Sequence, residues 1–454
     1  MALGFKGKKV YVYGLGKSGV TTAHALAEDG AQVCVWDDAA LEDDLKEGRF
    51  ITGLLTSDDA HFCNPQDVDW SLLDVIFKAP GIPMDVPFIE RAVGKEKPVM
   101  GDVDLLYRRE PNAQFIGVTG TNGKSTTTAL IGHILKEAGY DVAVGGNIGD
   151  AVMSLPEGKE IYVVELSSYQ LETMNEMKLD RAVIINLTED HLERHGTMQN
   201  YFNMKARIFE RMDDDAIKIM GVDEKEMQAF ASSYALPLKT VSIIGRDADF
   251  QVTKEGDVTR GGKTIFSAGC YPALSGCHNW QNIACAFAIV RDMVSLEDFQ
   301  KSLSTFHGLP HRMERVLVKG DITCINDSKA TNPVAANYAL DGFSHIYWIV
   351  GGQSKTEGVK PCLDHLQNVR AAFVVGENRE GFVNDLQGRV EIYDCGTMDK
   401  AVEEAWRLAH KEGLENACIL LAPACASWDQ FKSFIHRGDV FSSLCRERAS
   451  LSES

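Results

Sequence analysis

The 454-residue sequence lacks the features that would place it in a membrane or outside a cell. No run of about 18 apolar residues could form a transmembrane helix, and the first residues, MALGFKGKKVYVYG, have neither the apolar region nor the cleavage site of a signal peptide. The 11 cysteines include no C-x-x-C pair, and an odd, scattered set in a chain of this length is typical of free thiols in a reducing compartment. The sequence therefore predicts a cytoplasmic protein with free cysteines.

Positive charge is also scarce. The chain has 46 Lys and Arg residues against 65 Asp and Glu, and its net charge is −19. A broad nucleic-acid-binding surface depends on Lys and Arg that neutralise phosphates, so this balance argues against one. It leaves room for local pockets that bind small phosphates. Apolar content of 44% is ordinary for a globular protein, and the length suggests about three domains.

Strand and helix patterns alternate along three sections of the chain. Residues 8–38 predict a strand, a glycine turn, a helix and a second strand, and a similar series begins near residue 113 and again near residue 306. The runs EIYVVELSS and RAVIINLTEDH are continuously apolar, as in parallel strands that are buried on both faces. Residues 245–270 are polar and rich in glycine, which indicates a hairpin or a loop. The pattern predicts doubly wound α/β sheets.

The stretch TGTNGKSTT, residues 119–127, is close to a phosphate-binding loop but lacks one of its glycines. The common pattern G-x-x-x-x-G-K-[ST] would require glycine where Val118 stands, and the pattern present is G-x-x-G-K-S from Gly120. A strand before the loop and an amphipathic helix after it would place unpaired N–H groups around a phosphate. Lys124 could then reach the outer phosphates, and the hydroxyl of Ser125 or Thr126 could bind Mg²⁺. The alternative is an ordinary turn between a strand and a helix.

Four further polar residues follow predicted strands or lie on a predicted helix. Glu165 ends an apolar strand, where it could hold Mg²⁺ or remain a solvated carboxylate. His191 follows the next apolar strand and is expected beside the metal. His195 lies four residues later, but no third ligand accompanies the pair, so zinc is disfavoured and His195 is expected at the surface or in a cap. Lys205 alone would be a solvated helical lysine.

The first glycine turn fits the dinucleotide pattern G-x-G-x-x-G. Gly14, Gly16 and Gly19 supply it, and Asp37 ends the second strand, where a ribose-binding acid is expected. The pattern by itself indicates NAD(P). It could equally hold another nucleotide diphosphate, because the glycines accommodate pyrophosphate and not nicotinamide.

The motifs together resemble the Mur ligases, over nearly the whole chain. They are TGTNGKST, VELSSYQLE, NLTEDHLERH, the helix with Lys205, GCHNWQNIACAFA, GLPHRME, NDSKATNP and PACASWDQF, in that order. NDSKATNP and APACASWDQFKSFIHRG resemble the branch of the family that adds D-glutamate to UDP-N-acetylmuramoyl-L-alanine in peptidoglycan synthesis. Such ligases use ATP to form an acyl phosphate, which the amine of the amino acid then attacks. Alternatives are a sister Mur ligase or a ligase like folylpolyglutamate synthase with another amino acid, an NAD-dependent dehydrogenase, or a non-catalytic nucleotide-binding scaffold.

The resemblance implies three α/β domains with short linkers near residues 103 and 308. They are a Rossmann-like UDP-substrate domain (1–103), a central P-loop-type ATPase domain with a mostly parallel sheet (104–308) and a Rossmann-like amino-acid domain (309–454). It also implies ATP, Mg²⁺ (two ions) and a carbamylated Lys205 as cofactors, in a monomer without nucleic acid or a membrane span.

The resemblance also assigns roles to residues of this sequence. For catalysis and metal binding it implies Lys124, Ser125, Glu165, His191, Lys205 and Asp327. For ATP it implies Gly120, Thr121, Asn122, Gly123, Lys124, Ser125, Thr126, Asn279, Asn282, Arg312 and Asp327. For the UDP substrate it implies Ser18, Asp37, Pro80, Gly81 and Asn147, and for D-glutamate Thr331, Lys355, Ser427 and Phe434. Lys17 stands at a variable position of the glycine turn, and its predicted contact with the diphosphate of the UDP substrate rests on its charge.

Overall fold

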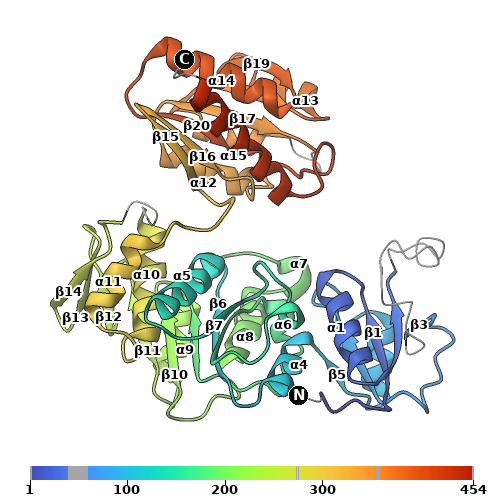
Figure 1. The fold of residues 1–454 in the computed structure, drawn as a ribbon. Helices are drawn as coiled ribbons and strands as arrows, with labels where there is room; N and C mark the ends of the chain where they lie inside the picture. The colour runs from blue at the N-terminus through green and yellow to red at the C-terminus, as the bar shows by residue number, and fades with distance from the viewer. Residues whose placement is uncertain (1–2, 39–59, 272–273, 275, 354–357, 452–454) are drawn as a thin grey trace. The chain divides into compact units, whose positions relative to one another are not determined.

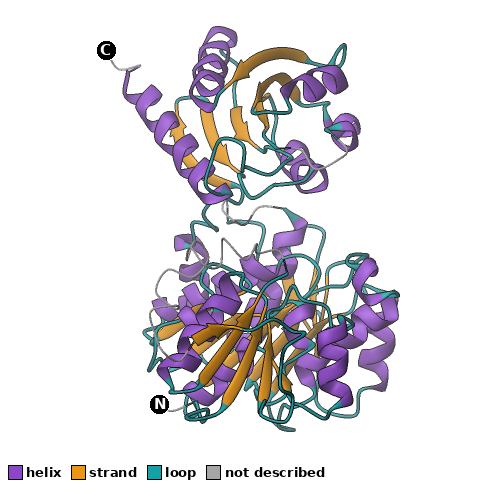
Figure 2. Ribbon diagram, turned by 90° about the vertical axis from the view of Figure 1, so that its right-hand side faces the viewer, coloured by secondary structure: helices purple, strands orange, loops and turns teal. Residues whose placement is uncertain are grey.

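The structure is a computed structural model that describes residues 3–38, 60–271, 274, 276–353 and 358–451 (Figure 1). Its contacts divide the chain into two compact units, Met1–Phe306 and His307–Ser454. Among the described residues, the first unit contains two sheets and the second contains one, and helices flank the sheets (Figure 2). These three mostly parallel sheets confirm the predicted α/β class. The domain boundaries at residues 103 and 308 stay predictions.

The first sheet is wholly parallel and has five strands in the order β3-β2-β1-β4-β5. The strands are β1 (Lys9–Tyr13), β2 (Gln32–Trp36), β3 (Ala60–Phe62), β4 (Val75–Lys78) and β5 (Val99–Met100), with helices α1 (Lys17–Glu28) and α3 (Pro87–Gly94). Since β2 and β4 lie on opposite sides of β1, the strand order reverses there. Ligands bind at such a reversal, outside the carboxyl ends of the strands. The glycine turn after β1 and the turn after β4 therefore share one edge.

The second sheet has nine strands in the order β14-β13-β12-β11-β10-β9-β6-β8-β7. They are β6 (Gln114–Thr119), β7 (Val142–Gly146), β8 (Ile161–Glu165), β9 (Arg181–Ile184), β10 (Ile217–Gly221), β11 (Lys239–Ser242), β12 (Phe250–Val252), β13 (Asp257–Arg260) and β14 (Lys263–Ser267). Only the β12-β13-β14 edge is antiparallel, which confirms a hairpin within residues 245–270. The strand order reverses at β6, because β8 and β9 lie on its two sides. The phosphate-loop motif follows β6 directly.

Helices cover both faces of the second sheet. They are α4 (Asp102–Arg109), α5 (Lys124–Glu137), α6 (Ser168–Leu171), α7 (Leu192–His195), α8 (Met198–Ala206), α9 (Lys225–Ser233), α10 (Cys277–Val290) and α11 (Leu296–Thr305), with short 3₁₀ helices η2 (Val152–Ser154) and η3 (Arg207–Phe209). α5, α10 and α11 bury one apolar cluster against the sheet. The opposite face belongs to a second cluster, which continues into the first sheet.

The second unit has a six-stranded sheet in the order β15-β16-β20-β17-β18-β19. Its strands are β15 (Glu314–Lys319), β16 (Ile322–Asn326), β17 (Ile346–Gly351), β18 (Val369–Val375), β19 (Glu391–Gly396) and β20 (Ala417–Leu421). Its helices are α12 (Pro333–Gly342), η5 (Lys360–His365), α13 (Arg379–Leu386), α14 (Met398–Glu412) and α15 (Phe434–Leu451). β15 alone is antiparallel to its neighbour. Buried, continuously apolar strands such as β17 explain why the chain forms a parallel sheet with helices on both faces.

One prediction about the cysteines is wrong. Cys34 and Cys63 form a disulfide, whereas all cysteines were expected to be free. The two cysteines meet because β2 and β3 are neighbouring parallel strands, with Cys34 opposite His61. Cys63 follows two residues after His61, and its Cα atom lies 5.4 Å from that of Cys34. Eight other cysteines of the described residues are free thiols. Within the described parts of the chain, no helix is both long enough and apolar enough to cross a membrane.

Candidate nucleotide and phosphate site

The loop after β6 is built around two glycines. Gly120 and Gly123 have φ angles of 154° and 78°, which residues with a Cβ atom rarely adopt. A Cβ atom on Gly123 would lie 2.2 Å from Oδ1 of Asn282, which leaves no room for one. Gly123 caps α5, so Lys124 and Ser125 are the first two residues of the helix. The short G-x-x-G-K-S motif thus forms a glycine turn at a helix N-terminus, the arrangement that binds phosphate.

Two lysines converge on one carbonyl of this loop. Lys124 Nζ donates a hydrogen bond to the Gly120 oxygen at 3.0 Å, and Lys205 Nζ donates to the same oxygen at 2.8 Å. Lys205 is only 1% exposed, so the expectation of a solvated lysine from the pattern alone is wrong. Burial, with the added charge of Lys124, holds the pKa of Lys205 well below its ordinary value. The site therefore contains an amine that loses its proton easily.

Glu165 lies at the end of β8, beside the loop. Its side chain is 1% exposed, and Oε1 accepts a hydrogen bond from the Asn147 side-chain amide at 3.0 Å. Oε2 is buried and has no hydrogen-bond partner among the described residues. A buried carboxylate oxygen without a donor is costly unless a ligand or cation satisfies it. This oxygen fits a divalent cation, for which carboxylates are suitable ligands.

His191 precedes α7 and caps it in the left-handed conformation, with φ of 52°. Its half-exposed ring lies 5.1 Å from the Tyr169 ring and 6.3 Å from the Tyr201 ring, measured between centroids. His195 was expected at the surface or in a cap, but it is buried and its Nε2 lies 3.0 Å from Ser168 Oγ. It also stacks on Tyr201. The two histidines therefore have different environments, and His191 is the one available to a ligand.

Tyr201 is a site residue that the sequence interpretation missed. Its hydroxyl lies 3.3 Å from the Thr121 hydroxyl, and Lys205 Nζ lies 4.4 Å from its ring centroid. Burial raises the pKa of Tyr201 to about 12. The signal was present, because Tyr201 and Lys205 are four residues apart on α8 and so lie on one face of the helix.

Asn282 of α10 lies against the same loop. Asn282 donates to Asn279 Oδ1 at 3.0 Å and lies against Gly123. Asn122 donates its backbone N–H to Asn186 Oδ1 at 2.9 Å, and its side chain donates to the Thr188 hydroxyl. The structure thus gathers the predicted ATP residues of the first unit around α5. Asn186, which was not predicted, ties the loop to the end of β9.

The first glycine turn forms a separate site at the end of β1. Gly14 has φ of 93°, and a Cβ atom on Gly19 would lie 1.8 Å from the Gly14 oxygen, so α1 packs tightly onto the turn. Asp37 accepts a hydrogen bond from the Leu15 N–H at 2.6 Å. Lys17 extends from the start of α1 to the Gly149 carbonyl, and its Nζ lies 3.8 Å from the Asp150 carboxylate.

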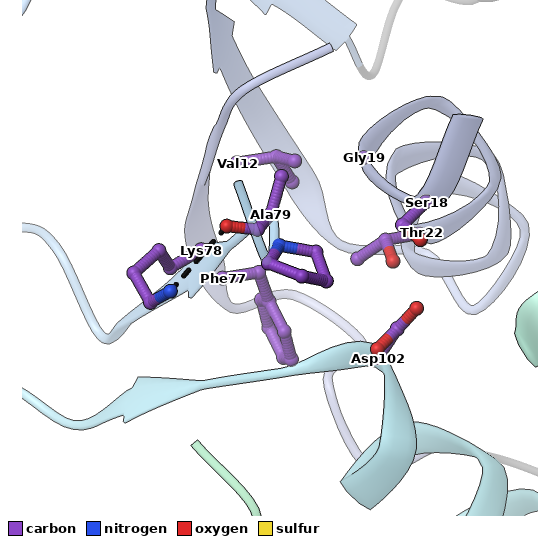
Figure 3. A pocket seen from close by; sticks show the side chains of 9 residues that line it. Val12, Ser18, Gly19, Thr22, Phe77, Lys78, Ala79 and Asp102 are labelled. Atoms are coloured by element: carbon purple, nitrogen blue, oxygen red, sulfur yellow. Dashed lines mark hydrogen bonds between the residues drawn. The ribbon is translucent and has the colours of Figure 1, made fainter. Parts of the chain in front are cut away.

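A small cavity lies beneath this turn. Ser18 and Thr22 of α1 line one side of it, Pro80 belongs to the turn after β4, and Asp102 of α4 faces them (Figure 3). Burial raises the pKa of Asp102 to about 6. Gly81, the neighbour of Pro80, is exposed. The predicted residues Lys17, Ser18, Asp37, Pro80 and Gly81 therefore lie around the adjacent ends of β1, β2 and β4.

The second unit gathers its own predicted residues at the ends of β16 and β20. These parallel strands pair with Asn326 opposite Leu421. Asp327 and the loop to Ser427 therefore both begin at the carboxyl ends of the strands, on the same edge of the sheet. Asp327 accepts a hydrogen bond from the Met313 N–H at 3.2 Å, and burial raises its pKa to about 6 against the opposing charge of Arg312.

Ser427 is buried, Phe434 begins α15 and Thr331 is exposed in the loop before α12. Lys355 lies outside the described residues. Arg437, which was not predicted, joins the two loops: its guanidinium donates to Ser328 Oγ at 3.0 Å and to the Cys425 carbonyl at 3.1 Å.

Comparisons with known proteins give matches along most of the chain. A family described as "Mur ligase middle domain" matches residues 118–290, and one described as "Mur ligase, glutamate ligase domain" matches residues 311–425. The UDP-N-acetylmuramoylalanine–D-glutamate ligase of Paramagnetospirillum magneticum is 41% identical over 97% of this chain and 96% of its own length. The protein of the same name from Rhodospirillum rubrum is 38% identical over 98% of this chain and 96% of its own length.

Solved structures show the same fold at low identity. The UDP-N-acetylmuramate–alanine ligase MurC of Thermotoga maritima has a TM-score of 0.59 at 18% identity, covering 97% of this chain and 99% of its own. The MurF ligase of Thermotoga maritima, in complex with ADP, has a TM-score of 0.58 at 16% identity, covering 100% of this chain and 97% of its own.

Proposed function

The chain belongs to the Mur ligase family, and from this we propose that it is an ATP-dependent ligase that adds D-glutamate to UDP-N-acetylmuramoyl-L-alanine. The observation that carries the proposal is similarity along almost the whole chain to two ligases named for this reaction, at 41% and 38% identity. The reaction supplies a precursor of peptidoglycan. ATP and the UDP-linked substrate are both compounds of the cytoplasm, where we expect the enzyme to act, as a monomer.

The reaction takes place in two steps on the substrates. An oxygen of the alanine carboxylate attacks the γ-phosphorus of ATP, the bond to the β-phosphate oxygen breaks, and ADP leaves. The amine of D-glutamate then attacks the acyl carbon, loses a proton, and expels inorganic phosphate. The protein contributes mainly positioning and electrostatic stabilisation, as in other phosphoryl transfers.

The loop after β6 binds the phosphates of ATP in this proposal. Its backbone N–H groups at the start of α5 and the charge of Lys124 stabilise the negative charge that develops on the transferred phosphoryl group. Lys124 now donates to two loop carbonyls, Gly120 at 3.0 Å and Thr121 at 2.7 Å, and would exchange these for phosphate oxygens. Asn279 and Asn282 lie on the adenine side.

Magnesium fits the acidic end of this site. Glu165 Oε2, buried and without a donor among the described residues, would be a ligand, with His191 and Ser125 beside it. Bound there, Mg²⁺ would screen the charges of the phosphate oxygens. Lys205 fits carbamylation, because CO₂ adds to a neutral amine and burial lowers the pKa of this one. A carbamate at Lys205 would replace this amine with a second anionic ligand.

The remaining predicted residues bind the other two substrates in this proposal. Residues 1–103 hold the UDP portion with Lys17, Ser18, Asp37, Pro80 and Gly81, and Asn147 reaches its muramoyl-alanine end. Residues 104–308 hold ATP. Residues 309–454 bind D-glutamate with Thr331, Lys355, Ser427 and Phe434, and supply Arg312 and Asp327 to the nucleotide.

The test is substrate-dependent release of phosphate from ATP. We expect release only when UDP-N-acetylmuramoyl-L-alanine and D-glutamate are both present. A parallel panel with L-alanine, meso-diaminopimelate and L-lysine distinguishes sister ligases, and release with one of these instead of D-glutamate would contradict the proposed substrate. Titration with NADH is the control for the first glycine turn: enhanced NADH fluorescence would favour a dehydrogenase.

A further inference from the structure

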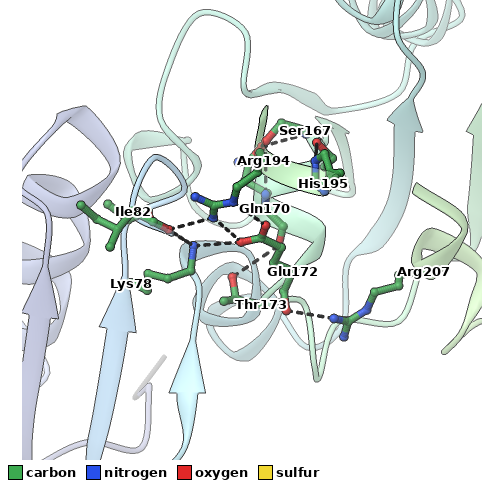
Figure 4. Close-up of polar contacts among 11 residues, drawn as sticks. Lys78, Ile82, Ser167, Gln170, Glu172, Thr173, Arg194, His195 and Arg207 are labelled. Atoms are coloured by element: carbon green, nitrogen blue, oxygen red, sulfur yellow. Dashed lines mark hydrogen bonds and ion pairs between the residues drawn. The ribbon is translucent and has the colours of Figure 1, made fainter. Parts of the chain in front are cut away.

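A buried ionic cluster lies between the first two sheets. It consists of Lys78 at the end of β4, Glu172 directly after α6, and Arg194 of α7 (Figure 4). Their side chains are 0%, 8% and 13% exposed. We call these three residues the junction cluster. Of its members, Lys78 also lines the cavity beneath the first glycine turn (Figure 3). All three lie in the first compact unit.

The two cations of the junction cluster share the same two acceptors. The Glu172 carboxylate accepts from both Nε and Nη2 of Arg194, at 3.0 and 2.6 Å, and from Lys78 Nζ at 3.3 Å. The carbonyl of Ile82 accepts from Lys78 Nζ at 2.7 Å and from Arg194 Nη2 at 3.0 Å. One carboxylate therefore holds two donors that both fix the backbone of the turn after β4.

This turn and α7 carry residues of two different substrate sites. The turn, residues 79–82, contains Pro80 and Gly81, and α7 begins immediately after His191. The Arg194 guanidinium also lies 5.0 Å from the centroid of Tyr169, whose ring lies 5.1 Å from that of His191. The junction cluster thus links the turn after β4 to the residues around His191 by direct contacts.

Burial makes the junction cluster sensitive to the loss of any one member. A buried ion pair contributes little net stability, but removing one partner leaves an uncompensated charge. Burial already lowers the pKa of Lys78 to about 8. A bond network of this kind is effective at fixing geometry, and the geometry that it fixes here is the spacing between the turn after β4 and α7.

We propose that Lys78, Glu172 and Arg194 are positioning residues for the ligase reaction, which hold the UDP-substrate turn in register with the phosphate site. The inference rests on the proposed function. The acyl end of the UDP-linked substrate must reach the γ-phosphate of ATP, and a misplacement of about 1 Å can cost about 100-fold in rate. The junction cluster sets that alignment without contacting the reacting atoms.

The experiment compares Glu172→Gln with a matched control, Glu176→Gln. Glu176 forms a two-bond ion pair with Arg108 of α4, at 2.6 Å to Nε and 2.5 Å to Nη2, four residues away from Glu172 in sequence but with no contact to residues 79–82 among those described. We expect Glu172→Gln to raise KM for UDP-N-acetylmuramoyl-L-alanine about 10-fold or more and to lower kcat, with KM for ATP within about twofold of the wild type. Glu176→Gln should leave both KM values within about twofold.

A second variant covers the case in which Glu172→Gln does not fold. Arg194→Lys keeps the charge and a bond to Glu172 but cannot also reach Ile82 in the same geometry, so we expect KM for the UDP substrate to rise about threefold. Equal effects of Glu172→Gln and Glu176→Gln, or equal changes in both KM values, would overturn the inference. So would an Arg194→Lys enzyme with unchanged KM. An inactive wild type in the same assay would instead overturn the proposed function and, with it, this inference.

Discussion

The first unit contains the same backbone device twice. After β1 and again after β6, a glycine turn leads into a helix whose first residue is a lysine, Lys17 in one case and Lys124 in the other. In both, an acidic residue ends a neighbouring strand of the sheet, Asp37 after β2 and Glu165 at the end of β8. The backbones alone would suggest two sites of one kind.

The side chains make the two sites different. The Lys17 side chain is 62% exposed and extends outward to Asp150, whereas Lys124 folds back onto carbonyls of its own loop. Asp37 is bound by the Leu15 N–H, whereas Glu165 keeps one buried oxygen without a donor. The first turn is complete without a cation, and the second is not. A glycine turn therefore indicates that phosphate can be bound, and the charged side chains around it indicate whether phosphate can be transferred.

The largest expected difference is between the two lysines. Lys124→Ala should lower kcat by about 10³-fold, because it removes the charge that stabilises the transferred phosphoryl group. Lys17→Ala should leave kcat within about twofold and raise KM for the UDP substrate a few-fold. Steady-state kinetics with all three substrates varied would check this. A Lys124→Ala enzyme with full turnover would contradict the assignment of the loop.

The next largest expected difference is between substitutions of the two acidic residues, Glu165 and Asp37. Glu165→Gln should lower kcat by about 10²-fold and raise the melting temperature of the ligand-free protein, since a buried oxygen without a donor loses its charge. Asp37→Asn should raise only KM for the UDP substrate, by about 3- to 10-fold, because the amide oxygen can still accept from Leu15. Calorimetry and kinetics on the same preparations would separate the effects. A lower melting temperature of Glu165→Gln would contradict the inference that the buried Glu165 oxygen without a donor destabilises the ligand-free protein.

Alanine substitutions of the glycines in the two turns should differ in their effect on protein stability rather than on the reaction rate. Gly123→Ala should destabilise the protein by about 2 kcal/mol, because φ is 78° and the new Cβ atom would meet Asn282 at 2.2 Å. Gly16→Ala is its counterpart in the first turn. There φ is −64° and no atom lies within 4 Å of the new Cβ, so the change should stay within about 0.5 kcal/mol. Chemical denaturation of both variants measures the difference, and equal losses would show that the second turn is no tighter than the first.

The smallest expected effect concerns the buried acid beneath the first turn. The pKa of Asp102 is raised from 3.8 to about 6. Between these values the folded state binds more protons than the unfolded state, so stability should rise as pH falls from 7 to 4.5. Asp102→Asn removes this dependence and should stabilise the protein above pH 7 by about 1–2 kcal/mol. Melting curves from pH 4.5 to 8 would show it, and parallel curves for both proteins would refute it.

Local sequence was enough to predict the two glycine turns and Glu165. Each follows a short apolar strand, and the end of such a strand in a parallel sheet has a fixed relation to the ligand edge. Even the departure at Val118 is explained locally, since Gly120 with φ of 154° opens the loop two residues later. Identification of the substrates needed motifs far apart in the chain.

Contacts between distant segments could not be predicted. Lys78 and Glu172 of the junction cluster are 94 residues apart, and nothing near either residue indicates the other. The Cys34–Cys63 disulfide depends on β3 lying next to β2, which spacing does not specify. His195 was misplaced for a related reason: its spacing from His191 was clear, but the Ser168 and Tyr201 side chains that bury it come from other elements.

The apolar cluster that continues from the first sheet into the second has a consequence for cooperativity. Its members include Val10 and Val33 of the first sheet and Tyr162 and Ile184 of the second, all fully buried. If either sheet unfolded alone, the apolar residues of the other sheet in this cluster would be exposed to water. The two sheets should therefore unfold together as one thermodynamic unit. The sequence pattern predicts three domains, but we expect thermal unfolding to show only two transitions, one for each unit on either side of the boundary after Phe306.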